Sequence, residues 1–205
     1  MLKSKTFLVL ILLISVVLGP LWAQEIFSIS SGANISYSQD SLASSSTDSD
    51  SFLFNKDNLA IGLEVRTNIT YFQLDAVGEL SVLDSNTLLL SGILSAGASV
   101  EIGSIAKIGL TFGPRIAYIY SQNSGSKEEG LAVSNGKNFI EAIKDGPVHV
   151  RLMVDFYAGP VISIGAAYTI PTNFTIGQGN WDQLLPSSES FKNGQISLCI
   201  QMKVF

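Results

Sequence analysis

Apolar and polar residues alternate with a period of two along most of this chain. In the last eleven residues, QISLCIQMKVF, the apolar Ile196, Leu198 and Ile200 alternate with Ser197 and Cys199. Such alternation predicts β-strands with one apolar and one polar face. Eight segments show it, and they are 27–37, 59–66, 72–82, 88–102, 106–120, 148–157, 162–170 and 195–204.

The connections between these predicted strands alternate in length. Tight turns are predicted after the second, fourth and sixth strands, near Thr67-Asn68, Gly103-Ser104 and Gly159-Pro160. The other connections are longer or richer in Ser, Asp and Asn, and they include 39–51, 83–86, 121–146 and 171–192. If the strands run antiparallel, all tight turns lie at one end of the sheet together with both chain termini.

One short helix is predicted inside the third of the long connections. Residues 137–145, KNFIEAIKD, place Phe139, Ile140 and Ile143 at helical spacing, and Gly146-Pro147 ends the pattern.

The apolar faces of the predicted strands contain no charged residue, whereas the polar faces mix charges with Gly, Ala and Ser. The interior of an eight-stranded barrel is narrow and cannot hold so many Leu and Ile side chains. The apolar faces are therefore expected to point outward, toward membrane lipid. A closed barrel also leaves no unpaired backbone in hydrocarbon, and strands of about 9–11 residues can cross it. We predict an all-β fold, a closed eight-stranded antiparallel transmembrane β-barrel with up-and-down topology.

Aromatic residues near the predicted strand ends agree with this orientation, because membrane proteins carry aromatic belts at both interfaces. The expected belt positions next to the long connections are Tyr37, Tyr118, Tyr120 and Tyr168. Those near the tight turns are Phe27, Phe72 and Phe156.

The N-terminal segment differs from the rest of the chain. Lys3 and Lys5 precede an apolar run of 13 residues, FLVLILLISVVLG, and a plausible cleavage site follows Ala23. This pattern predicts a secretory signal peptide over 1–23 and a barrel over 24–205. The alternative is an uncleaved anchor helix.

Composition excludes several functional classes. Charged residues make up 14% of the chain, against about 25% in ordinary globular domains. Removal of residues 1–23 leaves 10 basic and 17 acidic residues, a net charge of −7, so no basic nucleic-acid footprint is expected. Cys199 is the sole cysteine and His149 the sole histidine. Neither a disulfide within the chain nor a zinc site of usual composition is therefore expected. We predict no cofactor.

These strands and connections resemble the small eight-stranded outer-membrane proteins, namely the OmpA transmembrane domain, OmpX and OmpW. The resemblance covers residues 24–205 and is architectural. It implies location in the outer membrane of a double-membrane bacterium, contact with its lipid, and assembly by periplasmic chaperones and the barrel-insertion machinery. In those families a terminal Phe is the assembly signal, and Phe205 matches it. Phe205 is one residue out of phase with the preceding apolar positions, so we expect it to leave the strand at the rim.

Charged residues on the predicted inner face are the candidate site. Isolated charges in a narrow interior are costly, so pairing is expected. The candidates are Glu64, Asp75, Glu79, Glu101, Lys107, Arg115, His149, Arg151 and Asp155. Counted from the nearest turn without allowance for shear, Asp75 and Arg151 lie near mid-depth. Glu64 and Asp155 lie near the tight-turn end by the same count.

Several functions remain open from the sequence. The leading interpretation is a non-enzymatic surface protein whose charges close the lumen. Its role is either structural, in support of the envelope, or adhesion to a surface partner through its loops. Passage of small apolar molecules is implied only by the resemblance to OmpW. The alternatives are a porin-like polar pore using Glu79, Arg115 and Arg151, a soluble ligand-binding barrel with its apolar face inside, and a lipid-modifying enzyme. The last requires a Ser beside His149, and no sequence feature marks one.

Overall fold

The computed structural model describes residues 26–38, 59–84, 87–121, 130–131 and 139–205. The predicted signal peptide over 1–23 and the predicted loop over 39–51 lie outside these ranges. Among the described residues, no helix is both long and apolar enough to cross a membrane.

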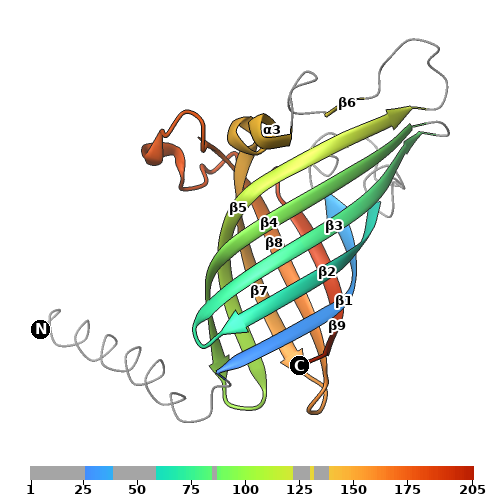
Figure 1. The fold of residues 1–205 in the computed structure, drawn as a ribbon, viewed down its shortest axis with the longest axis vertical. Coiled ribbons are helices and arrows are strands. Elements are labelled where there is room, and N and C mark those ends of the chain that lie inside the picture. The colour runs from blue at the N-terminus through green and yellow to red at the C-terminus, as the bar shows by residue number, and fades with distance from the viewer. Residues whose placement is uncertain (1–25, 39–58, 85–86, 122–129, 132–138) are drawn as a thin grey trace, which may run out of the picture.

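Eight long antiparallel strands close into a barrel (Figure 1). They are β1 (Phe27–Ser38), β2 (Leu59–Ile69), β3 (Phe72–Asp84), β4 (Thr87–Ile102), β5 (Ala106–Ser121), β7 (Pro147–Tyr157), β8 (Ile162–Thr175) and β9 (Gln195–Lys203). Each strand pairs with the long strand before and after it, and β1 pairs with β9, so the ring is complete. The predicted fold class is confirmed.

The described parts of the connections contain three shorter elements. Strand β6 (Gly130–Leu131) pairs with the C-terminal part of β5, at Tyr118 and Ile119. Helix α3 (Phe139–Asp145) precedes β7. The 3-10 turn η3 (Trp181–Gln183) lies between β8 and β9. We call this end of the barrel the long-connection end. The opposite end, with both ends of the barrel chain and the three tight turns, is the short-turn end (Figure 1).

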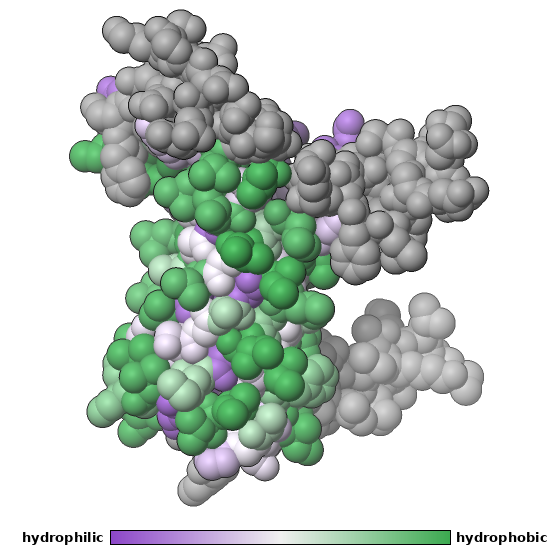
Figure 2. Space-filling model, turned by 90° about the vertical axis from the view of Figure 1, so that its right-hand side faces the viewer, coloured by the Kyte–Doolittle hydropathy of each residue, from purple (hydrophilic) through white to green (hydrophobic). Residues whose placement is uncertain are grey.

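Side chains alternate between the two faces of the wall. Leu63, Leu94 and Leu198 are 71%, 62% and 64% exposed on the outside, whereas Glu64 and Arg66 are 0% exposed on the inside. Apolar side chains cover much of the outer wall visible in Figure 2. The barrel therefore has the reverse of a soluble protein's arrangement, with its apolar residues outside and its charges inside.

The residues of the predicted aromatic belts can be located along the strands. Phe27, Phe72 and Phe156 are exposed near the short-turn end. Near the long-connection end, Tyr37 of β1 and Tyr168 of β8 are both in register with Ile196 of β9, one on each side of that strand. Tyr118 pairs with Leu90 at that end, and the side chain of Tyr120 lies outside the described part.

The turn after β2 corrects one prediction. Thr67 pairs with Leu74 and Asn68 with Gln73, so β2 continues to Ile69 and the turn lies at Thr70, whose φ is 55°. The side chain of Asn68 is buried in the lumen and its amide donates to Ser28 Oγ at 3.3 Å. The turn propensity of asparagine alone would place Asn68 in the turn, but its inward hydrogen bond keeps it in the strand.

Part of the apolar stripe is not exposed at the long-connection end of β7 and β8. Val150 and Ile170 pair across the two strands and were expected to face outward, but they are 6% and 1% exposed. Helix α3 and the β8–β9 connection lie at this end and meet through Gly177 N–H, which donates to Lys144 O at 2.8 Å. Protein packing therefore covers this section of the stripe.

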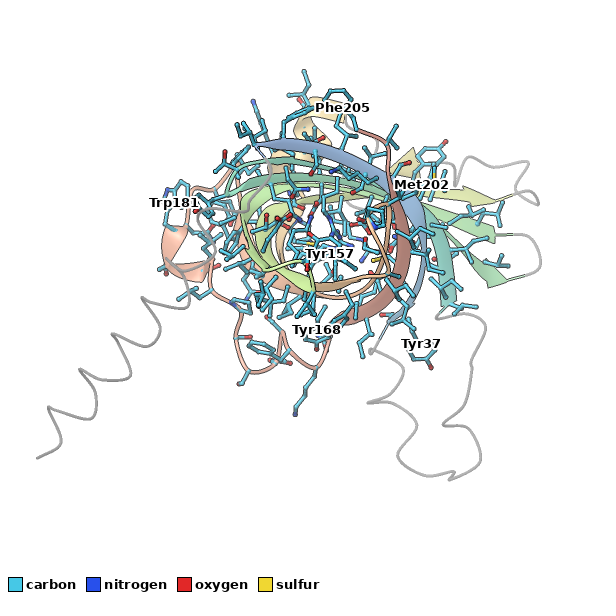
Figure 3. All side chains as sticks on the ribbon, turned by 90° about the horizontal axis from the view of Figure 1, so that it is seen from below. Tyr37, Tyr157, Tyr168, Trp181, Met202 and Phe205 are labelled. Carbon is cyan, nitrogen blue, oxygen red and sulfur yellow. The ribbon has the colours of Figure 1, made fainter. Side chains whose placement is uncertain are left out.

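The last residue also differs from expectation, because Phe205 does not leave the wall. Val204 N–H and Phe205 N–H both donate to Ile29 O, at 2.8 and 3.2 Å, and Ile29 N–H donates to Phe205 O at 2.8 Å. Two residues of one strand thus oppose one of the other, which is a β-bulge. The bulge resets the phase, and Phe205 lies on the outside of the ring, as does Met202 (Figure 3).

Candidate functional site: the charge network of the lumen

Five charged side chains from three strands meet in the lumen, and we call them the central network: Glu64, Arg66, Asp75, Arg151 and Asp155. Arg66 donates from Nη2 to Glu64 Oε1 at 2.7 Å and from Nη1 to Asp155. Its Nε lies 3.2 Å from Asp75 Oδ1 but makes no well-aligned hydrogen bond there. A single guanidinium from β2 thus contacts three carboxylates.

Arg151, from β7, contacts two of these carboxylates, Glu64 and Asp75, from the other side of the lumen. Its two terminal nitrogens donate to the two oxygens of Glu64, both at 2.8 Å, which is the bidentate geometry of strong Arg–carboxylate pairs. Arg151 Nη1 also lies 3.4 Å from Asp75 Oδ2. Two arginines therefore bridge strands that face each other across the barrel.

Neutral polar residues complete the hydrogen bonds of Asp75. Gln73 donates to its Oδ1 at 2.8 Å, and Thr111 donates to its Oδ2 at 3.3 Å. Thr111 Oγ1 also lies 2.9 Å from Ser95 Oγ. Asp75 is fully buried, and its ionised form needs these contacts because hydrogen bonds must replace the water it has lost.

A second group, the upper cluster, lies toward the long-connection end and surrounds Glu79. Ser36, Gln195 and Arg115 donate to its carboxylate, the last two at 3.0 and 3.2 Å. Arg115 Nη1 also donates to Gln195 Oε1 at 2.7 Å, and its Nη2 to Ser91 Oγ at 3.0 Å. This cluster joins β1, β3, β4, β5 and β9 in one network.

The remaining candidates lie apart from these two groups. His149 is buried, and its Nδ1 lies 3.1 Å from Pro147 O. Glu101 lies near the short-turn end, where it accepts a hydrogen bond from Tyr157 OH at 2.9 Å. Lys107 pairs in register with both Glu101 and Asp155. Tyr157 points into the ring in Figure 3.

The depths counted from the turns do not describe these contacts. Glu64 and Asp155 were placed near the short-turn end, yet both contact arginines of the central network. In a barrel the strands tilt and are staggered, so residues at different counts along their strands reach the same level.

Arg66 was not among the residues singled out from the sequence, although it has the most carboxylate partners of the network. Its position two residues after Glu64, on the same inner face, was the available signal.

The network can close the lumen. Glu64, Arg66 and Asp75 are 0% exposed, so side chains fill the interior at their level. No His, Cys, Asp and Glu residues in the described ranges are grouped to hold a metal ion. Cys199 faces the lumen and is buried without a disulfide, as a small apolar side chain would be.

Comparison with known proteins finds similar solved structures but no similar sequence. No protein-family model and no curated protein matches the sequence. Similar solved structures include a de novo designed transmembrane β-barrel, 9% identical over 88% of this chain and 98% of that chain, with a TM-score of 0.45. Ail, the attachment invasion locus protein of Yersinia pestis, is 10% identical over 86% and 95%, with a TM-score of 0.45.

A third similar structure is that of Neisserial surface protein A. It is 12% identical over 89% of this chain and 98% of that chain, with a TM-score of 0.44. At these values the likeness is distant, and it assigns no ligand or activity to this chain.

Proposed function

We propose that this chain is a non-enzymatic outer-membrane surface protein whose barrel spans the lipid with a closed lumen. The observation that carries the proposal is the contrast between the two faces of one wall. Leu63 and Leu198 are exposed on the outside, whereas their neighbours Glu64 and Cys199 are buried. Such a large apolar surface is unfavourable on a monomeric protein in water but favourable in contact with lipid hydrocarbon. The proposed location is the outer membrane of a double-membrane bacterium.

Closure of the lumen is supported by the two charge groups, which fill the barrel at successive levels. A hydrated ion passing them would have to separate Arg66 and Arg151 from their carboxylates. Removing one partner of a buried pair costs about 3–5 kcal/mol, so the pairs favour a closed interior over a polar pore.

Planar-bilayer recording of the purified barrel tests closure. The wild type should show no steady openings, and a variant carrying both Glu79→Ser and Arg115→Ser should also stay closed, because the central network remains. Steady, ion-selective openings of the wild type would overturn closure in favour of the polar pore.

Insertion in the membrane has its own test, which separates it from a soluble ligand-binding barrel. Membrane fractionation should recover the chain with the outer membrane, and gel migration should change on heating, as it does for detergent-resistant barrels. Recovery in the soluble periplasmic fraction would contradict the proposal.

The proposed role at the surface is contact through the long connections. In the β8–β9 connection, Trp181 and Leu185 are 72% and 78% exposed, and Trp181 projects away from the ring (Figure 3). Exposed aromatic and aliphatic side chains suit either a surface partner or the lipid interface. Adhesion measured with Trp181→Ser and Leu185→Ser, each still folded, should fall if the connection binds a partner.

An enzymatic function has less support. His149, the sole histidine, bonds a backbone carbonyl rather than a serine, and its side chain is buried inside the wall. A lipid-modifying site would need its base beside a nucleophile on the lipid side.

A further inference from the structure

A cavity of about 290 Å³ lies at the short-turn end of the barrel, on the opposite side of the central network from the upper cluster. Its rim is formed by two tight turns, at Gly103 and Gly159, and its wall includes Ser28 and Gln201 from β1 and β9. Lys107 reaches it from the start of β5. The cavity is therefore a pocket enclosed by the barrel mouth.

The charge of the lining is opposite to that of the chain as a whole. Its charged residues are Lys107, Lys203 and Glu101, a net charge of +1, whereas the chain carries −5. The carboxylate of Glu101 is engaged by Tyr157 OH. An excess of positive charge inside a low-dielectric wall attracts an anion.

Lys107 is the main cation of this pocket. It is 7% exposed, although lysine is almost never so buried without a partner. Among the residues that the structure describes, no carboxylate lies within 4.0 Å of its ammonium group. Asp155 pairs with Arg66 instead, and Glu101 accepts a hydrogen bond from Tyr157 OH. An ammonium group offers three hydrogen-bond donors, and no carboxylate contacts this one directly.

Gln201 supplies an independent second signal. Its side chain lines the same cavity and is 2% exposed, and its Oε1 accepts a hydrogen bond from Ser30 Oγ at 3.1 Å. That bond orients the amide, and the Nε2 donor is left with no acceptor among the described residues. Buried donors are almost always satisfied, so an unsatisfied one beside a cavity indicates an acceptor that is missing.

We infer that the short-turn end is a binding site for a small oxyanion, a carboxylate or a phosphate, held by the Lys107 ammonium and the Gln201 amide. The ligand approaches from the side of the tight turns, which is the periplasmic side if the barrel is inserted as proposed. The site does not depend on closure of the lumen, since the central network lies beyond it.

Titration of the ¹⁵N-labelled barrel in detergent micelles tests the site by nuclear magnetic resonance. Inorganic phosphate and acetate are added in separate series at constant ionic strength, with chloride as the control for screening. Saturable shifts are expected at the amides of Ser104, Lys107 and Gln201. The stronger of the two responses identifies the source as phosphate or carboxylate.

Two variants and a matched control make the test specific. Lys107→Met keeps the length of the side chain and should weaken binding about ten- to a hundredfold, as expected for loss of a hydrogen bond to a charged group. Gln201→Leu should weaken it about fivefold to tenfold by loss of a neutral donor. Lys192→Met, in the β8–β9 connection at the other end of the barrel, should leave binding unchanged.

The site would be overturned by the absence of saturable shifts in the wild type, or by equal binding in Lys107→Met. Shifts that chloride reproduces would show screening alone and would overturn it as well. Gel migration with and without heating identifies any variant that fails to fold, and Gln201→Leu then carries the test if Lys107→Met does not fold.

Discussion

The ring of Phe205 packs edge-on against the ring of Phe27, with centroids 5.7 Å apart and planes at 62°. Phe27 is the first residue of β1, and Phe205 follows β9, so this contact lies on the seam that closes the barrel. The β-bulge at Ile29 makes it possible, because the extra residue turns Phe205 to the outer face that Phe27 already occupies. The last residue thus combines a closing contact with an exposed ring.

Substitution of Phe205 should impair closure. Phe205→Ala removes the ring contact, and such aromatic pairs contribute about 0.5–1.5 kcal/mol. If the exposed ring is also the assembly signal, the folded fraction in cells should fall further than this energy predicts. Heat-dependent gel migration measures the folded fraction. Phe191→Ala, at another exposed Phe outside the strands, is the control and should have little effect.

Comparison with Phe27→Ala separates the two roles of Phe205. Loss of the ring contact alone should make the two variants equal, whereas an assembly signal should make Phe205→Ala the more severe. A folded fraction of Phe205→Ala equal to that of the wild type would contradict both roles.

Arg66 should be essential to stability. Arg66→Met leaves Glu64, Asp75 and Asp155 without their shared cation in a fully buried site, and we expect a loss of about 3–5 kcal/mol in the free energy of unfolding. Urea unfolding of the barrel in lipid vesicles measures this quantity. Lys192→Met should change it by no more than about 0.5 kcal/mol, as expected for an exposed residue. Equal stability of Arg66→Met and wild type would show that the network contributes nothing.

Alternation along the chain was sufficient to predict the fold and the side of the wall for residues such as Leu63 and Glu64 within the strands. Each residue of a strand points to one of only two faces. Once the apolar face is assigned to the outside, Leu63 lies outside and Glu64 inside. Ile170 faces outward as predicted, but packing from distant segments buries it, and a local pattern carries no information on such packing.

The candidate site was less predictable, since its contacts depend on stagger between strands. Arg66 and Asp155 come from β2 and β7, and only the closed ring brings them together. Phe205 shows a similar limit, because one extra residue at a bulge reverses the side on which it lies. No residue type in KVF marks that bulge.

Two glycines should respond differently to the same substitution. At Gly113 a Cβ atom would lie 2.0 Å from Leu94 O of the neighbouring strand, so Gly113→Ala forces the backbones apart. Overpacking of this kind costs about 1–3 kcal/mol. At Gly78 nothing lies within 4 Å of the added atom, and Gly78→Ala should be neutral or stabilise by about 0.5–1 kcal/mol. In urea unfolding the midpoint should therefore fall for Gly113→Ala but not for Gly78→Ala, and equal shifts would contradict the close strand approach.

A charged residue on the lipid-facing side of the wall should be more destabilising the deeper it lies in the membrane. Leu63 lies in the middle of β2 and is 71% exposed, whereas Ile105 lies in a tight turn at the rim and is 69% exposed, so the pair differs in depth rather than in exposure. Leu63→Arg should lower the free energy of unfolding in lipid vesicles by about 2–4 kcal/mol, and Ile105→Arg by about 0–1 kcal/mol. In a soluble barrel both surfaces would face water, and neither arginine would be costly. Equal effects of the two substitutions would therefore contradict membrane insertion of this wall.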